Sequence, residues 1–313
     1  MAPEFQLSEE NIKFFYQNCY IGPFDLMSPE ETEQMRDHLV NSVFNVPPKI
    51  LKYEFQEDNG LADELFPEHE DDRQLTEKQK HKILAQMGRT NRHIEDEKLL
   101  NLFQRPAIVE RCAQLLGEDL ILWRSDCFEV PPHADGTPWH QASTWFFHNF
   151  REPVAHPLDE EDLFQVTCWI ALTDANKEKG CVALFPGTHK EIYPVKVDRK
   201  VNEPNAKHRY IIGELDYPTE DKSPQLIEVK AGQFFIFCER AVHGSIPNQT
   251  DSSRWGINCR IAKTSTRFFT NKRMFSEGHQ IAYYKLRDVS LDRWKAVLVR
   301  GTDRFGYNPL LNQ

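Results

Sequence analysis

The sequence Thr-Pro-Trp-His-Gln-Ala at residues 137–142 stands between two apolar stretches of the kind that form β-strands. The first, residues 120–130, runs into a turn rich in proline and glycine, and the second contains Trp-Phe-Phe at residues 145–147. One known type of metal site uses a histidine at such a junction together with an Asp or Glu two positions later. That position holds Ala142. The stretch around His140 therefore predicts a metal-binding corner from which one ligand is missing.

The chain after Asp119 is divided by turn residues into eight short β runs, whereas the part before it is mostly helical in pattern. Short strands with Pro- and Gly-rich connections favour a double-stranded β-helix, the jelly-roll or cupin architecture, with N-terminal helices braced against one sheet. We therefore expect a mainly β (α+β) fold. The expected strands are residues 120–130, 141–147, 164–172, 182–185, 225–229, 233–238, 242–246 and 255–263.

Capping signals place the helices. Ser8 and Ser28 are N-cap residues, and Ser28 is followed by Pro29 at the first helical position and Glu31 three residues after the cap. Gly117 ends a third apolar helix that we expect to pack on the sheet. The expected helices are residues 8–19, 28–44, 106–116 and 291–299.

A chain of 313 residues with 40% hydrophobic content can bury one sizeable core, so we expect a single domain over residues 1–313. Its parts would be a helical region (1–118), the jelly-roll core (119–265) and a C-terminal extension (266–313). Residues 52–92 are charged and lack apolar periodicity, which predicts an irregular insertion with one short helix near residues 77–87.

Composition restricts the possible partners. Acidic residues outnumber basic ones by 48 to 38, giving a net charge of −10, so we expect no nucleic-acid or membrane partner. No stretch approaches the roughly 20 apolar residues of a membrane span, and the first residues lack the pattern of a signal peptide. We therefore expect a cytoplasmic protein. The sequence gives no indication of its oligomeric state.

The seven cysteines are widely separated and include no Cys-x-x-Cys pair, so we expect neither a zinc ribbon nor a disulfide framework. Most lie in apolar surroundings, and we interpret them as buried reduced thiols. Isolated histidines in β proteins are usually hydrogen-bonded core residues. That interpretation covers His133, His148, His156 and His189.

A second metal-binding histidine is available at His243, 103 positions after His140 (243 − 140) and directly after a β run. Arg254 follows eleven residues later (254 − 243), and its planar guanidinium matches a carboxylate and stays charged when buried. Arg260 lies on the same side of the same predicted strand as Arg254, because side chains repeat every two residues.

These residues resemble the phytanoyl-CoA hydroxylase-like branch of the Fe(II)/2-oxoglutarate enzymes. Within that branch, residues 136–142 are most similar to the aliphatic halogenases, in which Ala or Gly replaces the carboxylate ligand. The resemblance runs from about residues 21–25 to the region after Arg260. It implies the jelly-roll fold, Fe(II) bound by His140 and His243, and Arg254 bound to the far carboxylate of 2-oxoglutarate.

The same resemblance assigns roles to other residues. Thr137 and Trp169 would donate hydrogen bonds to 2-oxoglutarate, although core packing is an alternative for Trp169. The halide pocket would be formed by Thr167, Trp145, Asp126 and Arg260, although Arg260 could instead pair with a surface carboxylate. Phe147 and Glu239 depart from the halogenase pattern, and a Glu close to a chloride would be unfavourable unless it turns away or is protonated.

Ala142 predicts a change of reaction. Without a carboxylate ligand, the metal has both a vacant position and a deficit of negative charge, and chloride can supply both. O2 and 2-oxoglutarate would then drive chlorination of an unactivated aliphatic C–H bond, with succinate and CO2 as co-products. The open position at Ala142 is thus the centre of the halogenase hypothesis.

Two alternatives remain. The His-Ala-Asp sequence at residues 133–135 is itself a His-x-Asp pair, and iron bound there would make the protein an ordinary hydroxylase. A non-catalytic binding protein that has lost a ligand is the other alternative, and the presence of His243, Arg254 and Thr137 argues against it.

The substrate would be a free small molecule or an aminoacyl or acyl group attached to a carrier protein. Carrier proteins are acidic, so docking would need a local basic patch, although charge runs are usually solvated faces. Candidate patches are Lys190, Lys196, Arg199, Lys200, Lys207 and Arg209, or Arg267, Lys272 and Arg273.

Overall fold

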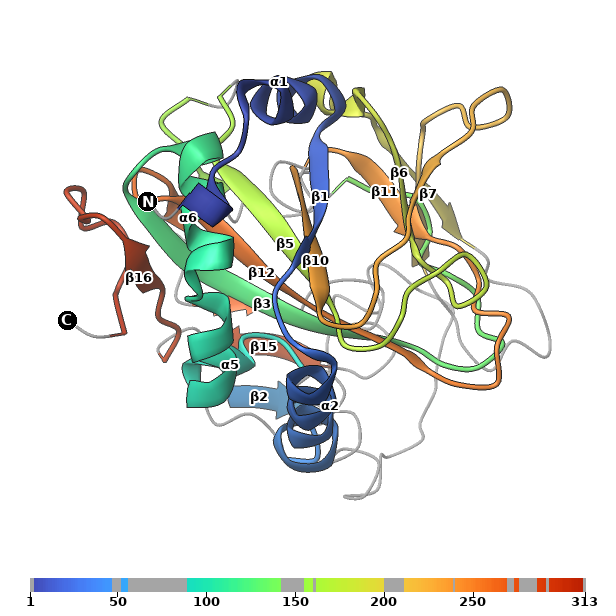
Figure 1. Ribbon diagram of the computed structural model, residues 1–313, viewed down its shortest axis with the longest axis horizontal. Coiled ribbons are helices and arrows are strands. Elements are labelled where there is room, and N and C mark those ends of the chain that lie inside the picture. The colour runs from blue at the N-terminus through green and yellow to red at the C-terminus, as the bar shows by residue number, and fades with distance from the viewer. Residues whose placement is uncertain are drawn as a thin grey trace.

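The computed structural model describes residues 3–46, 52–55, 89–141, 155–159, 162–199, 211–238, 240–268, 273–275, 286–290 and 293–311. Two antiparallel sheets form its core (Figure 1). The larger has the strand order β1 (Tyr20–Asp25), β10 (Gln233–Cys238), β5 (Gln165–Ala171), β12 (Arg254–Lys263), β3 (Leu120–Val130) and β16 (Val297–Arg300). The smaller has the order β11 (Val242–Ser245), β6 (Val182–Phe185) and β9 (Gln225–Ile227).

Short strands form three further small sheets in the described part of the chain. β13 (Arg267–Phe268) pairs with β4 (Ala155–His156), and β7 (Val195–Arg199) pairs with β8 (Ile211–Leu215). β15 (Leu286–Ser290) lies between β14 (Arg273–Phe275) and β2 (Lys52–Phe55). The helices are η1 (Pro3–Phe5), α1 (Glu9–Asn18), α2 (Pro29–His38), η2 (Leu39–Val43), η3 (Arg92–Ile94), α5 (Glu97–Phe103), α6 (Pro106–Leu116) and η4 (Thr188–Lys190).

Local sequence explains where the N-terminal helices begin. The Ser8 hydroxyl accepts a hydrogen bond from the Asn11 amide, and the Ser28 hydroxyl accepts one from the Glu31 amide. In both cases the side chain of the third helical residue binds back to the cap, which forms a complete capping box. The predicted caps at Ser8 and Ser28 are confirmed.

The two faces of the larger sheet have different neighbours. On the outer face, Cys168 meets α6, and its Sγ lies 3.4 Å from the Sγ of Cys112. On the inner face, Phe237 turns towards the smaller sheet, where its ring centroid lies 4.8 Å from that of His243. Figure 1 shows α6 lying along the larger sheet. The space between the two sheets is therefore the place where inward-facing polar side chains can meet β11.

The mainly β jelly-roll expectation is confirmed, and seven of the eight expected strands correspond to β3, β5, β6, β9, β10, β11 and β12. The eighth, residues 141–147, lies outside the described residues apart from Gln141. The expected helix at residues 77–87 also lies outside them.

The helix expected at residues 291–299 is wrong, because residues 297–300 form β16 and pair with β3. A short apolar run fits either a helix or a strand, and the free edge of β3 decides the outcome in favour of a strand. β1 and α5 were not expected. β1 carries Gly22 and Pro23, which interrupt the strand signal in the sequence.

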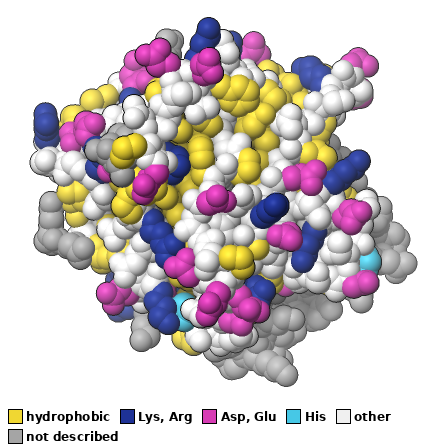
Figure 2. Space-filling view, in the orientation of Figure 1, with side chains coloured by type: hydrophobic (Ala, Val, Ile, Leu, Met, Phe, Trp, Pro, Cys, Tyr) yellow, Lys and Arg dark blue, Asp and Glu magenta, His cyan; other side chains and the backbone are white. Residues whose placement is uncertain are grey.

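Figure 2 shows apolar side chains gathered in the upper part of one face of the molecule, where α1 and β1 lie in Figure 1. On α1, Phe15 is buried, whereas Phe14 and Tyr16 are 40% and 47% exposed. α1 thus presents apolar side chains on two sides. No helix in the described part of the chain has both the length and the apolar run needed to cross a membrane.

Candidate functional site

His140 and His243 form a β-bridge between the stretch before residue 141 and β11. The amide of each donates to the carbonyl of the other over 2.9 Å, and their ring centroids are 4.1 Å apart. Two glycines permit this close approach. A Cβ atom added at Gly136 would lie 1.7 Å from the Ser245 carbonyl oxygen, and one added at Gly244 would lie 2.5 Å from the Thr137 carbonyl oxygen.

Main-chain carbonyls fix the tautomer of both imidazoles. Nδ1 of His140 lies 2.8 Å from the Pro138 oxygen, and Nδ1 of His243 lies 2.8 Å from the Ala241 oxygen. A carbonyl can only accept a hydrogen bond, so Nδ1 carries the proton and Nε2 keeps its lone pair. Burial, followed by the neighbouring His140, lowers the pKa of His243 well below its ordinary value. The pair therefore offers two neutral nitrogen ligands with backbone support, as metal-binding histidines generally do.

Arg254 is buried on the inner face at the start of β12, with 2% of its surface exposed. Its Nε donates to the Gly180 carbonyl over 3.2 Å, and its guanidinium carbon lies 5.2 Å from the Trp169 ring centroid. Nη1 is buried and has no hydrogen-bond partner among the described residues. Burial lowers the pKa of Arg254 to about 10. A buried guanidinium with an unused donor fits an anionic ligand, because an unpaired buried charge is costly.

Thr137 lies on the same stretch as His140 and beside β11. Its amide donates to Ser245 Oγ over 2.8 Å, and that hydroxyl lies 3.3 Å from Thr137 Oγ1. A Cβ atom added at Gly180 would lie 2.9 Å from the Ile246 carbonyl oxygen. The carbonyl that Arg254 binds therefore belongs to a residue packed against the chain directly after β11. This packing brings the Arg254 end of β12 near the strand that carries His243.

Strand register gathers the other inner-face residues. Asn258 on β12 stands opposite Asp126 on β3 and Trp169 on β5, and Arg260 stands opposite Thr167. Directly opposed side chains lie on the same face of a sheet. Thr167 is also opposite Phe237, whose ring contacts His243. The structure thus places these residues on the face that is directed at β11.

Trp169 packs so closely over Gly256 that an added Cβ atom would lie 2.2 Å from the ring. Its ring also lies 5.8 Å from that of Phe235 and under Arg254. These contacts show core packing around the indole and, at the same time, place it beside the candidate carboxylate-binding arginine. The indole supports Arg254 from one side.

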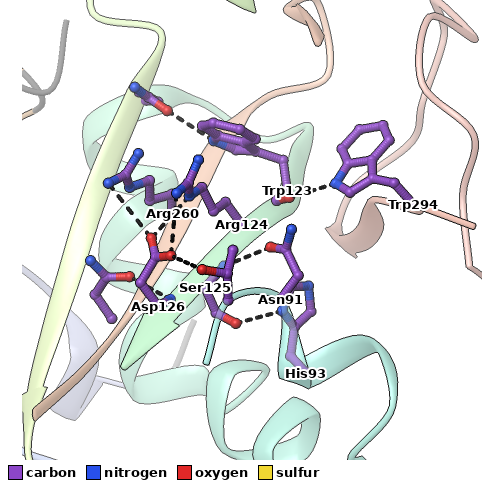
Figure 3. Close-up of polar contacts among 11 residues, drawn as sticks. Asn91, His93, Trp123, Arg124, Ser125, Asp126, Arg260 and Trp294 are labelled. Carbon is purple, nitrogen blue, oxygen red and sulfur yellow. Dashed lines mark hydrogen bonds and ion pairs between the residues drawn. The ribbon is translucent and has the colours of Figure 1, made fainter. Parts of the chain in front are cut away.

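A buried charge network surrounds Asp126, as Figure 3 shows. Its Oδ2 lies 2.9 Å from Arg124 Nε and 3.7 Å from Arg260 Nη2, and its Oδ1 accepts from the Thr90 hydroxyl over 2.8 Å. Burial raises the pKa of Asp126, but the charges of Arg124 and Arg260 outweigh it, and the pKa is lowered. The Asn258 amide oxygen accepts from the Asp126 backbone. Arg260 therefore pairs with a buried carboxylate.

The sequence interpretation grouped Asp126 with Arg260 but missed the three residues that complete the network, Thr90, Arg124 and Asn258. Arg124 could have been found, because it stands two positions before Asp126 on the same predicted strand and therefore on the same face. No feature of the sequence identified Thr90 as a neighbour of Asp126. Thr90 follows a charged segment whose path past β3 cannot be read from periodicity.

Some of the residues singled out in the sequence lie outside the part of the chain that the structure describes. Ala142 and Trp145 lie outside the described residues, as do Phe147 and Glu239, so their identities come from the sequence alone. His133 is described, and its side chain is 62% exposed with Nε2 2.8 Å from Asp251 Oδ1. The structure thus brings His140 against His243, and it places His133 at the surface.

Comparison with known proteins shows which family this chain belongs to. The family model described as "Phytanoyl-CoA dioxygenase (PhyH)" matches residues 15–256. The chain is 25% identical over 187 residues to "Phytanoyl-CoA dioxygenase, peroxisomal" from Homo sapiens, covering 57% of this chain and 50% of that protein. It is 23% identical over 268 residues to "Phytanoyl-CoA dioxygenase domain-containing protein 1" from Danio rerio, covering 79% and 87%. The match thus spans half of the length of the human relative.

The solved structure "CytC3 with Fe(II) and alpha-ketoglutarate" has the same fold. It aligns with a TM-score of 0.66 and 23% identity over 98% of this chain and 93% of that one. The likeness in fold therefore extends over nearly the whole chain.

Proposed function

Because this chain belongs to the phytanoyl-CoA dioxygenase family of Fe(II)/2-oxoglutarate-dependent oxygenases, we propose that it is a non-haem iron halogenase. Its reaction would be chlorination of an unactivated aliphatic C–H bond, coupled to the conversion of 2-oxoglutarate and O2 to succinate and CO2. The substrate would be a small molecule or an aminoacyl or acyl group on a carrier protein. The observation that carries this proposal is Ala142, which stands two positions after His140 in place of a carboxylate ligand.

His140 and His243 would hold the iron. Their Nδ1 atoms donate to the Pro138 and Ala241 carbonyls, so Nε2 of each neutral imidazole would be the ligand atom. When bound, Fe(II) would activate O2 for the oxidative decarboxylation of 2-oxoglutarate and for the oxidation of the substrate C–H bond. The backbone bridge between the two histidines keeps their rings together before any metal binds.

Arg254 would bind the far carboxylate of 2-oxoglutarate. Its buried Nη1 lacks a partner in the described chain, and a carboxylate would satisfy it through a charge-assisted hydrogen bond. Trp169 covers the guanidinium and excludes water from that side. Thr137, on the His140 stretch, would add a hydroxyl donor.

The two imidazoles bring no negative charge, so an anion is the appropriate occupant of the position that Ala142 leaves open. Arg260 lies close enough to His243 for its positive charge to act on that imidazole. Such a charge favours an anion over neutral water near the metal. Asp126 would orient Arg260 through their ion pair, and Thr167 stands opposite Arg260 on β5.

The deciding experiment is anaerobic reconstitution with Fe(II) and 2-oxoglutarate, in which the visible metal-to-ligand charge-transfer band is followed as chloride is added. We expect a saturable, chloride-dependent shift of the band. Ala142→Asp should form the band without the shift and should lose chlorination. His133→Ala is the matched control, and it should behave as the parent protein does.

Hydroxylation is the second candidate function, because the curated relatives are named dioxygenases. It predicts a charge-transfer band that ignores chloride, and oxygen in place of chlorine in the product. Chlorination at the normal rate by Ala142→Asp would refute the halogenase proposal.

A further inference from the structure

Three side chains that the proposed reaction does not use come together at one end of the larger sheet. They are Cys19, which caps the end of α1, His189 in η4 and Cys238 at the end of β10. One ligand atom from each lies within 4.8 Å of the other two. Among the residues that the structure describes, no other group of three His, Cys, Asp or Glu side chains meets this condition.

The backbone holds the two sulfur-bearing residues in place. Cys19 adopts a left-handed conformation with φ 64°, and its carbonyl accepts a hydrogen bond from the Cys238 amide over 3.0 Å. Both cysteines are buried, with 1% and 2% of their surface exposed. The Gly187 amide, two residues before His189, donates to Asn18 over 3.4 Å. The three elements are therefore already joined around the cluster.

The ring of His189 is oriented for ligation. Its Nε2 lies 3.0 Å from the carbonyl oxygen of Tyr16, which can only accept, so Nε2 carries the proton. Nδ1 then has a lone pair. It is buried and makes no conventional hydrogen bond within the described chain. A metal-binding histidine characteristically donates its other N–H to a carbonyl in this way.

We propose that Cys19, His189 and Cys238 form a second metal site, which binds a thiophilic divalent cation of the zinc type. A set of two sulfurs and one imidazole nitrogen binds zinc more tightly than it binds iron(II) or magnesium. Tetrahedral zinc with bonds of about 2.0–2.3 Å needs ligand atoms about 3.5–3.8 Å apart, so atoms already within 4.8 Å of one another need only small rotations. Water would take the fourth position, on the side where His189 is partly exposed.

The location assigns the cation a structural role. It would fasten α1 and η4 to β10, and Cys238 is five residues before His243 (243 − 238). Cys238 ends β10 of the larger sheet, and His243 lies on β11 of the smaller one. This site does not depend on the halogenase proposal, since none of its ligands contributes to the His140 and His243 pair.

Cobalt(II) is the probe that separates the two sites, because thiolate ligands give an intense near-ultraviolet charge-transfer band that nitrogen ligands cannot give. The full-length protein is freed of metal with a chelator, reduced with a phosphine and titrated anaerobically with Co²⁺. We expect a thiolate band that saturates at one equivalent and disappears when Zn²⁺ is added. Cys19→Ser and Cys238→Ser should each abolish the band. Cys112→Ser, a buried thiol outside the cluster, should retain it.

Circular dichroism would show whether the serine variants fold. If they do not, His189→Ala is the second test of the site, because it keeps both sulfurs. It should bind Co²⁺ at least tenfold more weakly and alter the band. The proposal is overturned if the folded, reduced protein with seven titratable thiols gives no thiolate band. It is equally overturned if the band survives in both serine variants, or if reduction of a Cys19–Cys238 disulfide yields thiols that take up no cation.

Discussion

Arg254 is the residue whose surroundings are least complete without a ligand, because its buried Nη1 has no partner in the described chain. Arg254→Ala should raise the concentration of 2-oxoglutarate needed for half-saturation by roughly 10²–10⁴-fold. That range corresponds to the 3–5 kcal/mol typical of breaking a buried charge pair. The measurement is a titration of the charge-transfer band with 2-oxoglutarate. Arg267→Ala, an exposed arginine on β13, is the control, and equal effects of the two variants would remove Arg254 from the role.

Asp126 should matter for stability in a pH-dependent way. Its folded pKa is lowered, so its contribution to the free energy of unfolding is present above the unfolded carboxyl pKa of about 3.9 and is lost as the pH falls through the folded value. Asp126→Asn should cost about 3–5 kcal/mol at pH 7. The difference from the parent should shrink below about pH 4.

Urea unfolding at a series of pH values tests this prediction. Asp251→Asn is the control, because that side chain is 99% exposed and its pairing with His133 should contribute less than about 1 kcal/mol. A constant difference between Asp126→Asn and the parent down to low pH would show that the variant acts through packing.

The sequence predicted that His140 and His243 would lie together, and the structure brings their rings to 4.1 Å, while their roles stay a prediction. His140, His243 and Arg254 stand at characteristic spacings, and the period of two in β12 placed Arg260 on the same face as Arg254. The neighbours of Asp126 could not be predicted as completely. Thr90 donates to that carboxylate and Asn258 accepts from the Asp126 amide, and both come from parts of the chain distant from Asp126 in sequence.

At the scale of elements, the bridge between the His140 stretch and β11 depends on Gly136. Gly136→Ala would place a methyl group 1.7 Å from the Ser245 oxygen, so the His140 stretch must move away from β11. We expect iron affinity to fall by about 10–100-fold, the range for residues that orient metal ligands. Gly306→Ala is the control for backbone strain without a close contact, because an added Cβ meets nothing within 4 Å there although its φ of +62° favours glycine.

Iron binding by both glycine variants can be measured by competition with a chromophoric chelator, and circular dichroism checks that the sheets persist. Undiminished affinity in Gly136→Ala would mean that the two histidines do not need the bridge.

Helices and strands that are marked by their own residues could be predicted from the sequence. Strands that form only by pairing with another strand could not. The capping boxes at Ser8 and Ser28 and the apolar run that opens β3 carry their own evidence. β16 was mistaken for a helix because its apolar residues fit both periods, and pairing with β3 supplies the missing information. The cluster of Cys19, His189 and Cys238 was not predicted either. Cys19 and Cys238 are 219 positions apart (238 − 19) and come together only in the folded protein.

At the scale of the whole molecule, the larger sheet is assembled from three parts of the chain. β1 and β16 form its two edges, and both lie outside the expected core at residues 119–265. The segment with β16 also buries Trp294, Val297 and Leu310. The core therefore depends on residues far from the site in sequence.

Removing residues 293–313 should destabilise the protein strongly. Val297 and Leu310 alone contribute about 3–6 kcal/mol of apolar burial, and β3 would lose one of its two neighbours. We expect a lower urea midpoint and poor solubility. Removal of residues 312–313 is the control and should change neither. A shortened chain with the parent's midpoint would show that β16 is dispensable.

The order of strands in the larger sheet also affects how the chain is made. β3 leaves the ribosome 167 residues before β16 begins (297 − 130), and β12, its other neighbour, begins 124 residues after it ends (254 − 130). Until β12 has been made, β3 therefore exposes its apolar residues with both edges unpaired. Such a nascent strand is a natural substrate for chaperones that bind extended apolar segments, and the speed of elongation past β12 would influence how much of the protein reaches its native state.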